Sequence, residues 1–144
     1  MFGPHLIMEA SGCNYEKLTD INLLTNLLNK LPEKMGMTKI MDPHVFEYKG
    51  EVVDDWGLSG IVIIAESHLA FHTFPDKGFV TVDIFSCKEF DVATAVKEIV
   101  DTYEPETWDE QLIMRGREFP KSLTKASMIV ETERKQHFNQ LVAA

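Results

Sequence analysis

Residues 58–87 decide the fold of this chain, and they read LSGIVIIAESHLAFHTFPDKGFVTVDIFSC. Three apolar runs follow one another here, at 58–65, 68–74 and 79–87, and their β-branched and aromatic residues predict three β-strands. The first run is apolar on both faces, which is typical of a central strand. The second and third runs are separated by the four residues PDKG. Because proline presets φ and glycine accepts a positive φ, we expect these two strands to form a hairpin.

The sequence before this core predicts a strand, a helix and a second strand. The strand is expected over 5–10. Asn14 is a suitable N-cap for a helix whose apolar residues recur at helical spacing up to Leu31, and Pro32 is expected to end or distort it. The second strand is expected over 37–48, with an edge position or a bulge at Pro43.

The sequence after the core predicts one more helix and one more strand. Asp91 is a suitable N-cap for the helix, which Pro105 stops, and a weaker strand is expected over 106–114. Residues 122–144 are polar and fit either a docked helix or a solvated tail. This order of elements predicts an α+β fold, a two-layer α/β sandwich with one mainly antiparallel sheet and helices on one face.

Length and composition indicate one acidic domain. The chain has 144 residues, 44% of them hydrophobic, and 14 basic against 23 acidic residues give a net charge of −9. We therefore expect a single domain over 1–144, and no nucleic-acid partner, because gripping phosphates requires gathered Lys and Arg. Two cysteines, Cys13 and Cys87, are too few for a disulfide framework, so a reducing, cytoplasmic setting is expected. No apolar run reaches membrane-spanning length, and the first residues lack signal-peptide features.

Reactive side chains concentrate in one part of the chain, namely Ser59, Glu66, Ser67, His68, His72, Asp76, Asp83 and Cys87. Strand alternation puts His68 and His72 on one face of their strand and Asp83 and Cys87 on one face of the next. This alternation predicts that the two strands present reactive groups toward one place.

Several simpler readings of these residues compete with a catalytic one. Cys87 could be a small buried hydrophobe, and Glu66-Ser67 an ordinary polar turn. A metal site is not expected, because the histidine pair lacks a third and a fourth ligand at fitting spacing. A serine hydrolase elbow is not expected either, since Ala65 and Leu69 stand where glycines are needed.

The arrangement around Glu66-Ser67-His68 closely resembles the prokaryotic S-adenosylmethionine decarboxylase proenzymes. A histidine follows the serine by five residues and a cysteine follows it by twenty, and the similarity extends from Gly3 to about Gly116. The resemblance implies self-cleavage between Glu66 and Ser67, which gives a β chain of 1–66 and an α chain of 67–144. It also implies that Ser67 becomes a covalent pyruvoyl group, the cofactor that forms a Schiff base with the substrate.

The resemblance further implies roles for other side chains. Ser59 and His72 match the processing residues, and Cys87 matches the proton donor. Asp76 stands where the family holds the substrate ribose with a Glu. The family aromatic that stacks on adenine aligns with Val53, so nearby aromatics, among them Trp56 and Phe46, are the expected substitutes.

The family also implies a homodimer with active sites at its interface, in which Ser67 and Cys87 of one copy meet Ser59, His72 and Asp76 of the other. The implied function is pyruvoyl-dependent decarboxylation of S-adenosylmethionine to the aminopropyl donor for spermidine biosynthesis. Two alternatives stay open: a pyruvoyl-dependent arginine or ornithine decarboxylase on the same fold, and an unprocessed binding or regulatory homologue.

Overall fold

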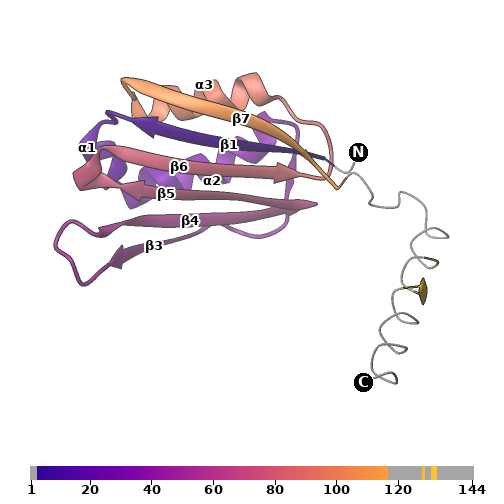
Figure 1. Ribbon diagram of the computed structural model, residues 1–144, viewed down its shortest axis with the longest axis horizontal. Helices are drawn as coiled ribbons and strands as arrows, with labels where there is room; N and C mark the ends of the chain where they lie inside the picture. The colour runs from indigo at the N-terminus through magenta and orange to yellow at the C-terminus, as the bar shows by residue number, and fades with distance from the viewer. Residues whose placement is uncertain (1–2, 117–127, 129–130, 133–144) are drawn as a thin grey trace.

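The β-branched runs of residues 58–87 form the middle of a seven-stranded antiparallel sheet (Figure 1). The structure is a computed structural model, which describes residues 3–116, 128 and 131–132. The middle strands are β4 (Trp56–Ala65), β5 (Ser67–Phe74) and β6 (Phe79–Ser86). A 3-10 turn, Pro75–Lys77, joins β5 to β6, and Gly78 completes it at a φ of 59°. The predicted hairpin is therefore confirmed.

The two outer sides of the sheet come from the two ends of the described chain. On one side, β1 (Gly3–Ser11) pairs with β6, and β7 (Thr107–Arg115) pairs with β1. On the other side, β2 (Thr38–Lys39) and β3 (His44–Lys49) both pair with β4. The strand predicted at 5–10 is confirmed with wider bounds, and the strand predicted at 106–114 is confirmed with a shift of one residue. The expected strand at 37–48 is instead two strands. Pro43 directly precedes β3, and proline has no N–H to donate to a sheet.

The helices are α1 (Tyr15–Leu18), α2 (Ile21–Lys34) and α3 (Val92–Tyr103), and they lie behind the sheet in Figure 1. The single helix predicted from Asn14 to Leu31 was wrong. Asn14 caps only α1, and the Asp20 side chain accepts a hydrogen bond from the Leu23 N–H, so a second helix begins there. Pro32 lies inside α2, which ends two residues later. Asp91 caps α3 as predicted.

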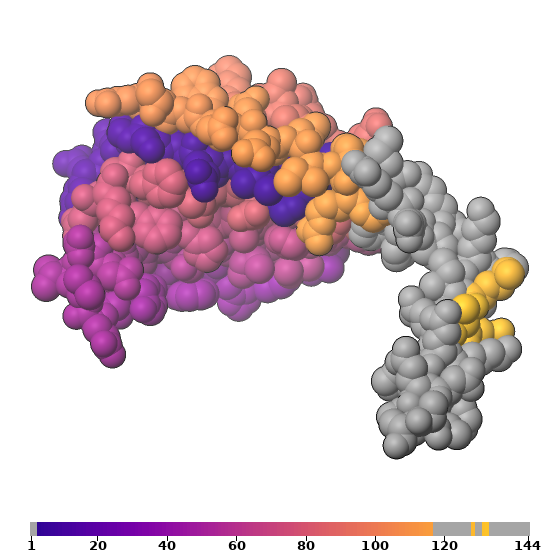
Figure 2. All heavy atoms as spheres, viewed as in Figure 1, coloured from indigo at the N-terminus to yellow at the C-terminus, as the bar shows by residue number. Residues whose placement is uncertain are grey.

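The sheet has one covered face and one open face, so the predicted α/β sandwich with helices on one face is confirmed. The helix-facing side chains of the middle strands are buried: Leu58, Val62, Ile64, Leu69, Phe71, Val80, Val82 and Ile84. The opposite face carries no helix among the described residues, and Figure 2 shows its strands uncovered toward the viewer. The prediction that the run at 58–65 forms a central strand is confirmed, since β4 pairs with β5 on one side and with β2 and β3 on the other. On the open face, Ile61 of this strand is 36% exposed.

A membrane helix is not part of the described structure. No helix among residues 3–116 combines the length and the apolar composition that crossing a bilayer requires. Residues 122–144, for which the sequence leaves a docked helix and a solvated tail open, lie almost wholly outside the described residues.

Thr73 links the sheet to the helical layer and provides a test of this packing. Its buried Oγ1 donates to the Leu18 carbonyl and accepts from the Leu58 N–H, both at 2.9 Å. Thr73→Val removes both bonds and is expected to lower the free energy of unfolding by about 1–3 kcal/mol, measured by urea denaturation. Thr81→Val on the open face is the control. Equal stability of the two variants would contradict this account.

Candidate active site

The reactive residues of the core form two clusters at opposite ends of the β4–β5 hairpin. Antiparallel pairing places Ser59 opposite His72 and Ile64 opposite Ser67. These two pairs are five residues apart along each strand, about 17 Å at roughly 3.4 Å per residue. We call them the Ser59 end and the Ser67 end. The expectation that the strands at 68–74 and 79–87 present their reactive groups toward one place was wrong within a single chain, since His72 lies at the Ser59 end and Cys87 at the Ser67 end.

At the Ser59 end, a serine and a histidine contact each other on the open face. Ser59 Oγ and His72 Nδ1 are 3.0 Å apart, and Phe46 of β3 lies directly opposite Ser59. Phe46, Ser59, Ile61, Ala70 and His72 line a shallow pocket of about 180 Å³. The hydroxyl and the imidazole of this pair therefore border an apolar hollow with an aromatic wall.

Trp56 and Asp76 extend the Ser59 end toward the β3–β4 loop. The Trp56 Nε1–H donates to Asp76 Oδ2 at 2.8 Å, across 20 residues of sequence. Trp56, Ser59, His72 and Phe74 line one further pocket. The sequence-predicted residues Phe46, Trp56, Ser59, His72 and Asp76 are thus brought together in one region by β3, β4, β5 and the 3-10 turn.

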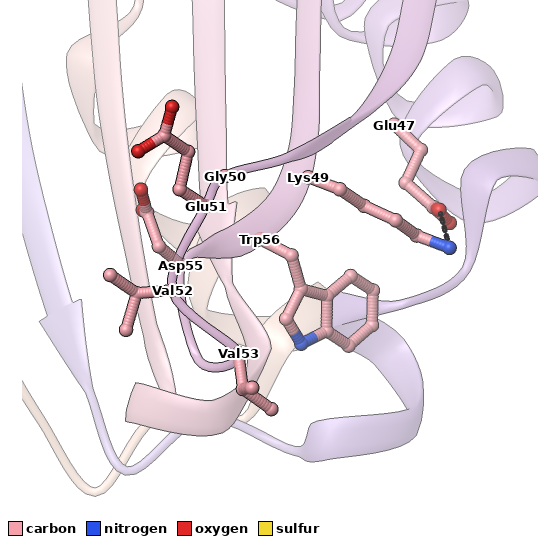
Figure 3. A pocket seen from close by; sticks show the side chains of 8 residues that line it. All are labelled: Glu47, Lys49, Gly50, Glu51, Val52, Val53, Asp55 and Trp56. Carbon is pink, nitrogen blue, oxygen red and sulfur yellow. Dashed lines mark ion pairs between the residues drawn. The ribbon is translucent and has the colours of Figure 1, made fainter.

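The β3–β4 loop holds a larger pocket beside Trp56, of about 500 Å³ (Figure 3). It is lined by Glu47, Lys49, Gly50, Glu51, Val52, Val53, Asp55 and Trp56. Glu47 and Lys49 form an ion pair at 2.9 Å. Val53 is 95% exposed, and it lines this pocket together with the Trp56 indole. An aromatic side chain is therefore present in the region where the sequence alignment gave only Val53.

At the Ser67 end, Glu66 forms the turn between β4 and β5. The Ala65–Glu66 peptide bond is cis, and Ser67 has a φ of 125°, a conformation that L-residues rarely adopt. Pairing with Ser86 of β6 fixes Ser67 at the start of its strand. The backbone N–H of Cys87 donates to the Glu66 carbonyl at 3.2 Å. This N–H would stabilise negative charge on the Glu66 oxygen if the carbonyl carbon were attacked.

The Cys87 thiol is held in its protonated form by its surroundings. Burial, the charge of Glu66 and a hydrogen bond with Glu66 raise the thiol pKa, and Lys88 lowers it by a smaller amount. The group is therefore a thiol at neutral pH, and it lies at the same end of the hairpin as Ser67. Cys13 is remote from this cluster, and burial raises its pKa to about 11.

Three further side chains, to which the sequence analysis gave no role, lie at the Ser67 end: His68, His5 and Asp83. Ser67 Oγ lies 3.4 Å from His68 Nδ1, and His5 Nε2 lies 3.0 Å from Asp83 Oδ1. Strand alternation predicted that His68 shares a strand face with His72 and Asp83 one with Cys87, but it did not predict their contacts. No sequence signal pointed to His5, because the β1–β6 pairing joins residues almost 80 positions apart.

Comparison with known proteins gives one consistent result. The sequence family described as S-adenosylmethionine decarboxylase matches residues 4–116. The S-adenosylmethionine decarboxylase proenzyme of Thermodesulfovibrio yellowstonii is 37% identical over 103 residues, which are 71% of this chain and 72% of that protein. The proenzyme of the same name from Bacillus velezensis is 32% identical over 114 residues, 79% of this chain and 86% of its own.

An archaeal relative and a solved structure extend the similarity. The S-adenosylmethionine decarboxylase proenzyme of Pyrococcus furiosus is 31% identical over 117 residues, 81% of this chain and 80% of that protein. The crystal structure of the adenosylmethionine decarboxylase of Aquifex aeolicus superposes with a TM-score of 0.66 at 26% identity. It covers 84% of this chain and 95% of its own.

The influence of Glu66 on Cys87 can be measured by alkylation. The measurement uses a Ser67→Ala chain, in which Glu66 stays an internal residue. In that chain the pKa of the Cys87 thiol should lie above its ordinary value of 9.0. Glu66→Gln removes the negative charge, so the pKa falls and iodoacetamide should modify Cys87 roughly 3-fold faster at pH 8. Peptide mass spectrometry distinguishes Cys87 from Cys13. Glu89→Gln, which removes the same charge from an exposed neighbour, should leave the rate unchanged, and an equal rate in all three chains would refute the assignment.

Proposed function

The chain belongs to the S-adenosylmethionine decarboxylase family, and we propose that it decarboxylates S-adenosylmethionine to the aminopropyl donor for spermidine biosynthesis. The observation that carries the proposal is the geometry at Glu66-Ser67. A serine with a positive φ directly follows a carbonyl that accepts a hydrogen bond from the Cys87 N–H. This is the arrangement that a chain needs in order to cut itself at that bond.

Self-cleavage at Glu66-Ser67 is the first reaction of the proposed function. Ser67 Oγ attacks the Glu66 carbonyl carbon, and the amide becomes an ester while the Cys87 N–H stabilises the developing oxyanion. Loss of the proton from the Ser67 Cα then breaks the ester and releases a β chain of 1–66. The α chain of 67–144 keeps residue 67 as a dehydroalanine, which tautomerises to an imine. Water then hydrolyses the imine, which releases ammonia and leaves a pyruvoyl group.

The residues around position 67 fit a pyruvoyl group. Pairing to Ser86 anchors this position at the first residue of β5, and the Cys87 thiol lies next to the turn. A pyruvoyl group supplies an electrophilic carbonyl that accepts the electron pair released with carbon dioxide. Cys87 holds a proton on Sγ at neutral pH, and we assign it the protonation of the product carbon.

Ser59 and His72 complete this reaction only if they come from a second copy of the chain. We assign His72 the removal of the Cα proton of residue 67, and Ser59 a hydrogen bond to the processing intermediate. Within one chain these side chains are about 17 Å from Ser67. A two-fold homodimer that pairs the open sheet faces would bring the Ser59 end of one copy to the Ser67 end of the other, and it would create two equivalent sites.

The Ser59 end also supplies groups suited to the substrate. We assign Asp76 the ribose hydroxyls, which a carboxylate binds by accepting two hydrogen bonds. Its contact with the Trp56 indole holds the shorter Asp side chain in place. Phe46 is 57% exposed on the open face and, with Trp56, offers an aromatic surface for adenine. These aromatic surfaces favour a nucleoside substrate over free arginine or ornithine.

We also propose that the enzyme works in the cytoplasm. Cys13 and Cys87 are both unpaired, and Cys87 needs a free thiol to deliver a proton. A reducing compartment keeps both thiols in that state.

Intact mass and carbon dioxide release test the proposed function together. The purified wild-type chain should appear as two chains meeting at 66/67, the second without a free N-terminal amine. It should release carbon dioxide from S-adenosylmethionine and at least about 100-fold more slowly from arginine or ornithine. Ser67→Ala should stay full length and inactive, because it lacks the attacking oxygen.

Two outcomes would contradict the proposal. A wild-type chain that stays full length with a normal serine at position 67 would exclude self-processing. A cleaved chain that prefers arginine or ornithine would leave the cleavage intact and overturn the substrate.

A further inference from the structure

The Ser67 end contains a compact group of side chains around the ring of Phe85, and the proposed function uses none of them. Phe85 is only 8% exposed although its side chain lies on the open face of the sheet. His68 packs edge-on against it with ring centroids 6.2 Å apart, and His5 lies 5.6 Å away on another side. The Arg115 guanidinium carbon lies 4.0 Å from the ring centroid. Four strands thus combine to fix the imidazole of His68.

The fixed imidazole of His68 faces the nucleophile. Its Nδ1 lies 3.4 Å from Ser67 Oγ, and register pairing with Ile63 and Phe85 holds the residue in the middle of the sheet. His72, the histidine already assigned to processing, is at the other end of the hairpin in the same chain. The nucleophile therefore has an imidazole of its own chain within reach before a second copy contributes any residue.

We propose that His68 is the general base of the first processing step, the conversion of the Glu66–Ser67 amide to an ester. The inference rests on the proposed function, because it assigns a residue to the self-cleavage described there. His68 differs from His72 in its target, since His68 acts on the Ser67 hydroxyl and His72 acts later on the Ser67 Cα.

The step balances with this chain's own atoms. His68 Nδ1 takes the proton of the Ser67 hydroxyl as Oγ bonds to the Glu66 carbonyl carbon. The tetrahedral oxygen is held by the Cys87 N–H. The bond between the Glu66 carbonyl carbon and the Ser67 nitrogen then breaks, and His68 returns the proton to that nitrogen. The products are an ester and a free amine, with no proton gained or lost overall.

The electrostatic surroundings keep His68 in the form that can accept this proton. The groups that face it are His5 from β1, Asp83 from β6 and Arg115 from β7. Burial, His5 and Arg115 lower the imidazole pKa, and Asp83, which is already bound to His5, opposes them. Because the lowered pKa lies below the ordinary 6.5, the ring is neutral at pH 7 and Nδ1 is free to act as a base.

The test follows self-cleavage of the full chain during cell-free synthesis at pH 7.5, with gel and mass detection of the 66/67 cut. His68→Ala should slow cleavage at least about 100-fold, as expected when a general base is removed. Added imidazole should restore much of the rate, because it supplies the missing base. His44→Ala, which removes an exposed histidine from the edge strand β3, is the matched control and should cleave like the wild type.

Hydroxylamine locates the blocked step, because it cleaves esters and leaves peptide bonds intact. His72→Ala stops after the ester forms, so hydroxylamine should cut that chain at 66/67. His68→Ala stops before the ester forms, so hydroxylamine should not cut it, and circular dichroism should show a folded chain.

The outcomes separate this inference from the proposed function. If the wild-type chain fails to cleave, both the proposed function and the role of His68 are overturned. If wild-type chain cleaves and His68→Ala keeps within about 3-fold of its rate, only the role of His68 is overturned. The role of His68 is also overturned if hydroxylamine cuts the His68→Ala chain at 66/67, because the ester would then form without this histidine. It is overturned as well if added imidazole leaves the slow cleavage of His68→Ala unchanged, because His68 would then contribute to packing alone.

Discussion

The antiparallel register between β4 and β5 sets the distance between the two ends of the candidate active site. It sets Ser59 against His72 and Ile64 against Ser67, and so separates a serine–histidine pair from the nucleophile by the length of a hairpin. The register follows from burial, because Leu58, Val62 and Ile64 on one strand and Leu69 and Phe71 on the other must face the helices. A slip of one residue would bury Ser59 and His72 and expose the core.

One face of the sheet packs against the helices, and the other carries the residues of the candidate active site. On the covered face, Gly60 lets α2 approach closely, since a Cβ there would lie 2.7 Å from Leu28 Cδ1. On the open face, polar and aromatic residues line shallow pockets at the Ser59 end and surround Phe85 at the Ser67 end. Under the proposed function, neither end alone holds the nucleophile, the Cα base and the ribose-binding carboxylate. In the proposed homodimer, a second copy of the chain would cover the open face and supply the missing residues.

Local sequence was enough to predict the architecture and the residues of interest, but their spatial grouping was not. The runs at 58–65, 68–74 and 79–87 identified three neighbouring strands, because β-branched alternation is a local signal. The break between α1 and α2 was missed although Asp20 is a suitable N-cap, because the apolar residues keep their helical spacing from Leu18 to Leu31 across it. The contacts of Cys87 with Glu66 and of His5 with Asp83 depend on strand pairing between distant segments, which alternation does not specify. For the same reason, alternation gave the correct face for His68 and His72 but wrongly predicted one shared site.

The central claim is that each active site combines the Ser67 end of one copy with the Ser59 end of another. Co-expression of a Ser67→Ala chain with a differently tagged His72→Ala chain measures this directly. Neither chain processes itself alone, but a mixed dimer contains one site with an intact Ser67 and an intact His72 from different copies. The account predicts that the His72→Ala chain is cut at 66/67 only when the Ser67→Ala chain is present. Mixed dimers in which the His72→Ala chain stays uncut would contradict it.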